Sequence, residues 1–171
     1  VPFDALPHLF NPSKGYVSSA NNRTVTDDYP YHIGTWYSLP SRFERINEML
    51  EAQPVLSVAD FERMQLDQHS KLAAQYLPVI LTGLQQATGL SANAQAALAM
   101  LQQWDYNMAA GEAAPAVFEV TYLKLMKRIF GDELDSLYTN FAGISSVSRI
   151  GFDQLIGLPA SPWFDDVTSP G

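Results

Sequence analysis

The sequence contains one short β-prone stretch, Tyr16-Val17-Ser18-Ser19, while helical periodicity dominates from Ser41 onward. A lone strand leaves the backbone N–H and C=O groups along its edges unpaired, so a stable strand needs a partner. The remaining sequence offers few segments that could pair with this stretch. We therefore expect residues 1–40 to contribute to a sheet that is completed by residues outside this sequence.

The expected fold class is mainly α, an irregular array of helices with one or two short N-terminal strands. Helical spacing of apolar residues begins at Ser41, and Ser57 and Asp60 have the spacing of a capping box that starts a second helix. Pro78 lies within a further helical pattern, where we expect it to kink or break the helix. By type of secondary structure, we expect the chain to divide into three segments: strand and loop at 1–40, helices at 41–158 and an extended tail at 159–171.

Composition limits the classes of partner. Charged residues make up 16% of the chain, against about 25% in an average soluble protein, which indicates surface that is covered by something outside this sequence. The net charge of −8 argues against nucleic-acid binding and against binding to an anionic membrane. The absence of cysteine excludes disulfides, thiolate metal sites and a cysteine nucleophile. No apolar run is long enough for a transmembrane helix.

Few residues offer metal or cofactor chemistry. The three histidines, His8, His32 and His69, lack the spacing of metal ligands. The adjacent carboxylates at 27–28 and 165–166 are interpreted as turn or cap residues, because neighbouring side chains usually diverge. Motifs for nucleotide, phosphate or zinc binding are not found. We therefore expect no cofactor and no metal site in this segment.

The strongest chemical signal is Asn21-Asn22-Arg23 at the end of the β-prone stretch, followed by Arg42 at the start of a helix. An Asn amide at a strand end can donate a hydrogen bond to a developing oxyanion, and an Arg can hold that amide and add positive charge. Two alternatives remain open at this point. Asn-Asn is also favoured in ordinary turns, and Arg45, one helical turn later, could take the place of Arg42.

The order of several short motifs over residues 9–130 resembles the β-chain of the penicillin acylase family, which belongs to the N-terminal-nucleophile hydrolases. Each motif is weak alone, and their order and spacing carry the resemblance. The motifs are Asn11-Pro12, Gly15-Tyr16-Val17, Asn21-Asn22, Tyr29-Pro30, Trp36, Arg42-Phe43-Glu44-Arg45-Ile46 with Leu50, Met64-Gln65-Leu66-Asp67 with Ser70, Leu77-Pro78, Trp104-Asp105 and Phe118-Glu119-Val120.

The resemblance implies a four-layer αββα fold, of which this chain would be one piece, and hydrolysis of linear N-acyl amides such as penicillins, cephalosporins or acyl-homoserine lactones. A precursor, or zymogen, cleaves itself to expose an N-terminal serine, which forms an acyl-enzyme with its own α-amine as the base. Carried over by position, Asn21 matches the oxyanion-hole Asn and Arg42 matches the Arg that supports it. Periplasmic or secreted localisation is implied in the same way.

The sequence departs from the family pattern in two places. Val1 is not a serine, threonine or cysteine, so we expect the chain to be an internal fragment of a β-chain and to be inactive by itself. Its partners would then be the remainder of the β-chain, the α-chain and a small N-acyl amide substrate. The family's structural calcium uses an Asp where this sequence has Tyr31-His32-Ile33, so a calcium ligand is not expected from this segment.

Two other interpretations compete with the hydrolase. A non-catalytic helical interaction module would explain the low charge equally well, since missing sheet and partner surface give the same signal in a sequence. It would be encoded by a complete reading frame of about this length. A small helical ligand binder is a third possibility, which no cluster of His, Cys or carboxylate residues supports.

Overall fold

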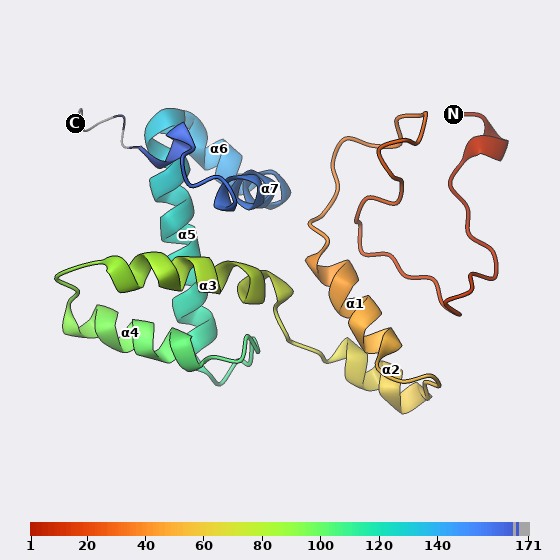
Figure 1. Ribbon diagram of the computed structural model, residues 1–171, viewed down its shortest axis with the longest axis horizontal. Coiled ribbons are helices and arrows are strands. Elements are labelled where there is room, and N and C mark those ends of the chain that lie inside the picture. Colours follow the sequence, from red (N-terminus) through yellow and green to blue (C-terminus); the bar gives the residue numbers. More distant parts are fainter. Residues whose placement is uncertain (166, 168–171) are drawn as a thin grey trace. The chain divides into compact units, whose positions relative to one another are not determined.

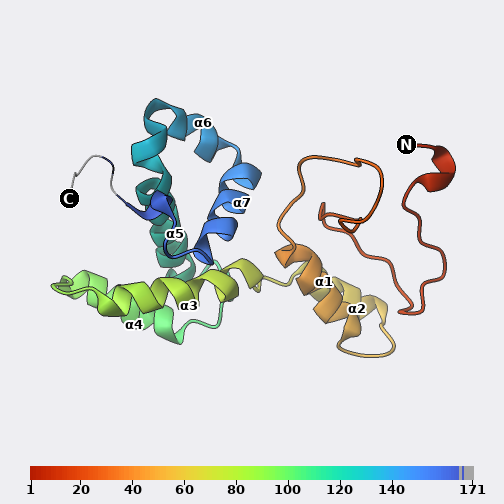
Figure 2. The same cartoon turned by 45° about the horizontal axis from the view of Figure 1, so that its top comes forward.

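The computed structural model describes residues 1–165 and 167 (Figure 1, Figure 2). Part of the tail expected at 159–171, namely residues 166 and 168–171, lies outside the described residues. The elements in chain order are η1 (Phe3–Ala5), α1 (Ser41–Glu51), α2 (Val58–Gln65), α3 (Lys71–Gln86), α4 (Ala92–Gln103), α5 (Ala113–Leu134), η2 (Asp135–Leu137), α6 (Tyr138–Gly143), α7 (Ser145–Ile156) and η3 (Pro162–Phe164).

The mainly helical fold class is confirmed, with no sheet among the described residues. The β-prone stretch at 16–19 forms no strand among these residues. A strand needs a second segment to pair with its backbone groups, and no segment of the described chain pairs with this one. Antiparallel pairing within the described part is confined to an isolated bridge between His69 and Asn107.

The chain forms two compact units, residues 1–67 and residues 68–171. The first unit contains a long N-terminal loop segment followed by α1 and α2, and the second contains α3 to α7 (Figure 1). The three segments expected at 1–40, 41–158 and 159–171 divide the chain by type of secondary structure, whereas the two units are defined by contacts between residues. The three-segment division therefore stays a prediction.

Helix α5 provides the largest share of the core of the second unit. Phe118, Tyr122, Met126 and Ile129 recur at helical spacing on one face, and each is less than 5% exposed. This face packs against α4, while α3 and α4 lie alongside each other (Figure 1, Figure 2). The ring of Phe118 lies 5.4 Å from that of Trp104 and 6.1 Å from that of Tyr122, measured between centroids.

Pro78 does not break its helix, because α3 continues from Lys71 to Gln86. Proline removes one backbone hydrogen bond in a helix interior and crowds the preceding turn. The flanking residues Tyr76, Leu77 and Ile80 are buried, and their burial offsets this cost. Of the kink or break expected at Pro78, the break is therefore wrong, and the kink stays a prediction. None of the helices in the described part is long and apolar enough to span a membrane.

The predicted capping box at the start of α2 is confirmed. The backbone N–H of Asp60 donates to Ser57 Oγ, and the backbone N–H of Ser57 donates to Asp60 Oδ2 at 2.6 Å. The hydroxyl of Ser57 also donates to the same carboxylate oxygen at 2.6 Å. These hydrogen bonds from Ser57 lower the pKa of Asp60 to about 2.

Ser57→Ala is therefore expected to raise the pKa of Asp60 from about 2 toward the ordinary value of about 3.9. The lowered pKa stabilises the fold above the unfolded-state value, and this stabilisation is lost as pH falls toward 2. Removing the hydroxyl should therefore lower the stability above the unfolded-state pKa and shrink the part of the stability that the wild type loses on acidification. An NMR titration of the Asp60 carboxyl measures this directly, and an unchanged pKa would contradict the assignment of Ser57 as the main cause.

Candidate functional site

A tight turn presents Asn21 directly after residues 16–20, an extended segment that includes the β-prone stretch. Asn21 has a φ of +61°, the left-handed region that Asn tolerates better than most residues. Asn22 builds this turn: its Oδ1 accepts from the backbone N–H of Ala20 at 3.0 Å, and its Nδ2 donates to the carbonyl of Arg23 at 2.9 Å. Ala20 is buried, whereas Asn21 is exposed. The turn therefore points the first Asn of the pair outward and uses the second as its support.

The structure brings Asn21 and Arg42 together. Arg42 lies in the first turn of α1, and its Nη2 donates to the carbonyl of Ala20 at 2.8 Å and to Asn21 Oδ1 at 3.0 Å. A longer bond of 3.3 Å reaches Ser38 Oγ. On the backbone, the N–H of Ser38 donates to the carbonyl of Asn21 at 2.8 Å. Both the main chain and the side-chain oxygen of Asn21 are thus held by neighbouring residues.

This arrangement determines which end of the Asn21 amide is available. A guanidinium group carries donors only, so the amide atom facing Arg42 is the oxygen. The amide nitrogen of Asn21 then points away from Arg42 and has no hydrogen-bond partner among the described residues. An exposed N–H₂ group whose carbonyl is held by a cation is a donor fixed in direction, as stabilisation of an oxyanion requires.

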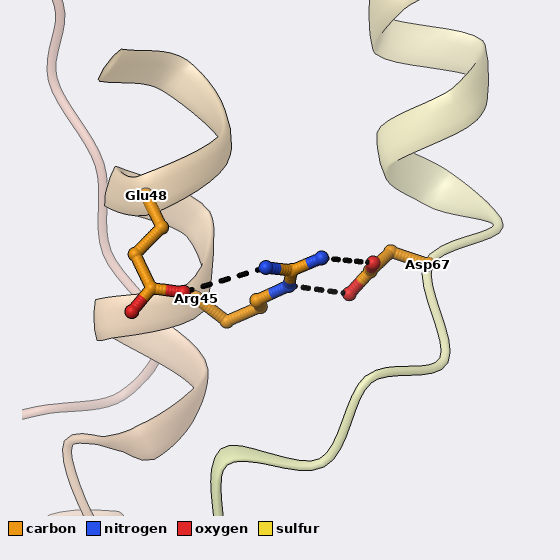
Figure 3. A network of polar contacts seen from close by, with 3 residues as sticks. All are labelled: Arg45, Glu48 and Asp67. Carbon is orange, nitrogen blue, oxygen red and sulfur yellow. Dashed lines mark hydrogen bonds and ion pairs between the residues drawn. The ribbon is translucent and has the colours of Figure 1, made fainter. Parts of the chain in front are cut away.

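Arg45, the alternative to Arg42, is engaged elsewhere (Figure 3). Its Nε and Nη2 donate to the two carboxylate oxygens of Asp67 at 2.9 and 2.6 Å, and its Nη1 lies 3.4 Å from Glu48 Oε2. Hydrogen bonding to Asp67 is the main cause that raises the pKa of the Arg45 guanidinium above its usual value. The paired, forked geometry fixes α1 to the chain just after α2. Arg42, not Arg45, is therefore the Arg that contacts Asn21.

The residues that support this site were not all visible in the sequence. Asn22 could have been found, because Asn side chains commonly bond to the backbone of their own turn. The contributions of Ala20 and Ser38 could not, since they involve main-chain groups or a serine that carries no pattern of its own.

No group of three or more His, Asp or Glu side chains within the described residues could hold a metal ion. The histidines take part in local contacts: His8 Nδ1 lies 3.1 Å from the carbonyl of Leu6, His32 Nε2 lies 3.2 Å from Thr35 Oγ1, and the ring of His69 packs edge-on against Tyr106. The expectations about cofactors and calcium stay predictions.

Comparison with known proteins assigns the sequence to a family. The sequence model of the penicillin amidase family matches residues 1–171. The chain belongs to the penicillin amidase family. The resemblance read from the motifs is thereby confirmed, and penicillin amidases are amide hydrolases. No solved structure gives a significant match.

Several curated relatives are acylases by name. Acyl-homoserine lactone acylase QuiP of Pseudomonas syringae pv. tomato is 29% identical over 98% of this chain and 22% of its own length. Penicillin acylase 2 proenzyme of Pseudomonas sp. (strain SE83) is 32% identical over 69% of this chain and 15% of its own length. QuiP of Pseudomonas aeruginosa is 28% identical over 94% of this chain. The chain spans 22% or less of the length of the first two relatives.

Proposed function

We propose that this chain is a segment of an N-terminal-serine amide hydrolase and supplies the oxyanion-hole amide through Asn21. The observation that carries the proposal is the Arg42 contact with Asn21 Oδ1, which leaves the Asn21 amide nitrogen exposed as a fixed donor. Family membership supports the reaction class, since the relatives are named as acylases of acyl-homoserine lactones and penicillins. The choice between penicillin, cephalosporin and lactone substrates depends on pocket residues beyond this segment.

The proposed reaction runs through an acyl-enzyme. The hydroxyl of an N-terminal serine, supplied by the β-chain outside these residues, attacks the amide carbonyl while its α-amine takes the proton. An α-amine has a pKa of about 7.7–8.0, so roughly a tenth to a fifth of it is neutral at pH 7 and can act as the base. The carbonyl oxygen becomes an oxyanion, to which Asn21 Nδ2 donates. Collapse expels the amine with the proton, and water then hydrolyses the ester to release the acid.

Arg42 has a supporting part in this proposal. Its contacts with the Ala20 carbonyl and Asn21 Oδ1 fix the amide plane, so the amide does not have to reorganise when charge develops on the substrate. Its positive charge also polarises the amide and makes Nδ2 a stronger donor. Arg42 therefore acts through Asn21.

Arg42→Ala in the full-length protein is expected to lower kcat by about tenfold or more, because a hydrogen bond from a charged group contributes about 1.5–3 kcal/mol. Arg42→Lys should restore part of the activity, since a lysine keeps the charge but lacks the planar donor geometry. Steady-state hydrolysis of a chromogenic N-acyl amide provides the measurement. Arg63→Ala removes an exposed Arg of α2 and serves as the control. Equal rates for Arg42→Ala and Arg63→Ala would rule out the supporting role.

A helical interaction module remains the second candidate, and exposed apolar side chains of the first unit favour it. Phe3, Phe10 and Trp36 are 89, 85 and 67% exposed, which is unusual for large apolar residues. In the hydrolase proposal, the rest of the β-chain and the α-chain cover these side chains within an αββα fold. The two candidates differ in activity: full-length protein that hydrolyses no N-acyl amide would favour the module.

The remaining parts of the proposal follow from the family and from the negative net charge. We propose that the 171 residues alone are inactive, because the nucleophile and its base lie on another segment, and turnover of a chromogenic N-acyl amide by the purified segment would refute this. A self-processed precursor, periplasmic or secreted localisation and the absence of nucleic-acid and membrane partners belong to the same proposal.

A further inference from the structure

The extended segment that precedes Asn21 alternates between two faces. Tyr16 and Ser18 are half-buried and Ala20 is buried, whereas Val17 and Ser19 are exposed. This is the period of two that a β-strand would show. Here the side chains of Tyr16 and Ser18 bond to helix α1, and not to a neighbouring strand.

Three polar contacts join this segment to α1 in antiparallel register. The hydroxyl of Tyr16 donates to Glu51, Ser18 Oγ donates to Asn47 Oδ1 at 2.7 Å, and Arg42 donates to the carbonyl of Ala20 at 2.8 Å. Each step of two residues in the segment corresponds to four or five residues along the helix in the opposite direction.

The two spacings match for a geometric reason. Two residues of extended chain advance about 6.6 Å, and four residues of α-helix advance about 6 Å. An extended segment can therefore follow a helix with one polar contact at every second residue, without strain accumulating between contacts.

The contact between Ser18 and Asn47, the second of the three, is also held in place by a hydrogen bond within α1. Asn47 Nδ2 donates to the carbonyl of Phe43, one turn earlier, at 2.9 Å. The amide nitrogen is used within α1, so Asn47 Oδ1 faces the Ser18 hydroxyl as an acceptor. Ser18 precedes Asn21 by three residues, and Asn47 follows Arg42 by little more than one helical turn. The contact thus ties together the two pieces of chain that carry the proposed oxyanion site.

We propose that Ser18 and Asn47 are positioning residues that set the place of the Asn21 amide by holding residues 16–21 to α1. The inference rests on the proposed function. Oxyanion donors act only when they lie within hydrogen-bond distance of the developing charge, and displacements of about 1 Å lower rates strongly. Arg42 fixes the direction of the amide, and the Ser18–Asn47 contact fixes the segment that delivers it.

The test uses the full-length protein, a chromogenic N-acyl amide and two adjacent serines. Ser18→Ala is expected to lower kcat about two- to tenfold with KM unchanged, since a neutral hydrogen bond contributes about 0.5–1.5 kcal/mol and the donation to the oxyanion is made in the transition state. Ser19→Ala removes the same hydroxyl from the exposed face and should behave as wild type. Ser18→Thr keeps a hydroxyl donor and should retain most of the activity.

A double mutant distinguishes positioning from loss of stability. Once Asn21 is replaced by alanine, Ser18→Ala should cause no further fall in kcat, because no amide remains to be positioned. A further fall in that background, equal rates for Ser18→Ala and Ser19→Ala, or an effect on KM alone would overturn the positioning role. If Ser18→Ala does not fold, Asn47→Ala removes the same contact from the helix side and the same outcomes apply.

The same series separates this inference from the proposed function. If Asn21→Ala keeps full kcat, the oxyanion assignment itself fails. If Asn21→Ala loses activity and Ser18→Ala matches Ser19→Ala, the oxyanion assignment stands and the positioning role fails.

Discussion

Asn21→Ala in the full-length protein is expected to lower kcat for N-acyl amide hydrolysis by about 10²–10³-fold, the usual cost of removing one oxyanion-hole donor. KM should change little, because the donor strengthens its contact as charge develops on the carbonyl oxygen. The expectation rests on the Arg42 contact with Asn21 Oδ1, which leaves the amide nitrogen exposed. Steady-state kinetics with a chromogenic N-acyl amide measure both constants.

Two further variants make this prediction specific. Asn21 has a φ of +61°, so alanine adds backbone strain of about 1–2 kcal/mol that could disturb the turn. Asn21→Gly removes the amide without that strain and should lose as much activity as Asn21→Ala. Asn93→Ala removes an amide from an exposed position in α4 and should leave kcat unchanged. Retention of full kcat in Asn21→Gly would contradict the role of the amide.

Phe118→Ala is expected to lower the free energy of unfolding by about 3–5 kcal/mol, the range for truncating a buried aromatic side chain. Phe118 is fully buried in α5, and its ring packs against Trp104 and Tyr122. The substitution removes these ring contacts and leaves a cavity between α4 and α5. Urea denaturation of the 171-residue chain, followed by circular dichroism, gives the change in unfolding free energy.

The matched control lies in the same helix. Leu123 also lies in α5 and is 60% exposed, so Leu123→Ala should change the unfolding free energy by less than about 0.5 kcal/mol. Equal losses in the two variants would show that the face of α5 containing Phe118 does not form the core.

Local signals in the sequence predicted the helical part well. The apolar spacing from Ser41 marked the start of α1, and Ser57 and Asp60 marked the cap of α2, because both depend on residues close together in the chain. The residue types suggested the association of Asn21 with Arg42 and left Arg45 as an alternative, and the family resemblance favoured Arg42. The structure shows the side chains of Asn21 and Arg42 in contact.

Features that depend on distant partners were missed. The stretch at 16–19 keeps the alternation of a strand, but it lies along α1 because hydrogen bonds to side chains of that helix replace those of a sheet. Pro78 stays inside α3 because tertiary burial outweighs the local cost of proline. The choice between Arg42 and Arg45 was open in the sequence, since it depends on Asp67, which lies 22 residues beyond Arg45.

The intact mass of the full-length protein after expression tests most directly whether this segment works within an N-terminal-serine hydrolase. Self-processing should give two chains, with the second beginning at a serine upstream of Val1. A single unprocessed chain would contradict the hydrolase mechanism and leave the helical interaction module as the function to test.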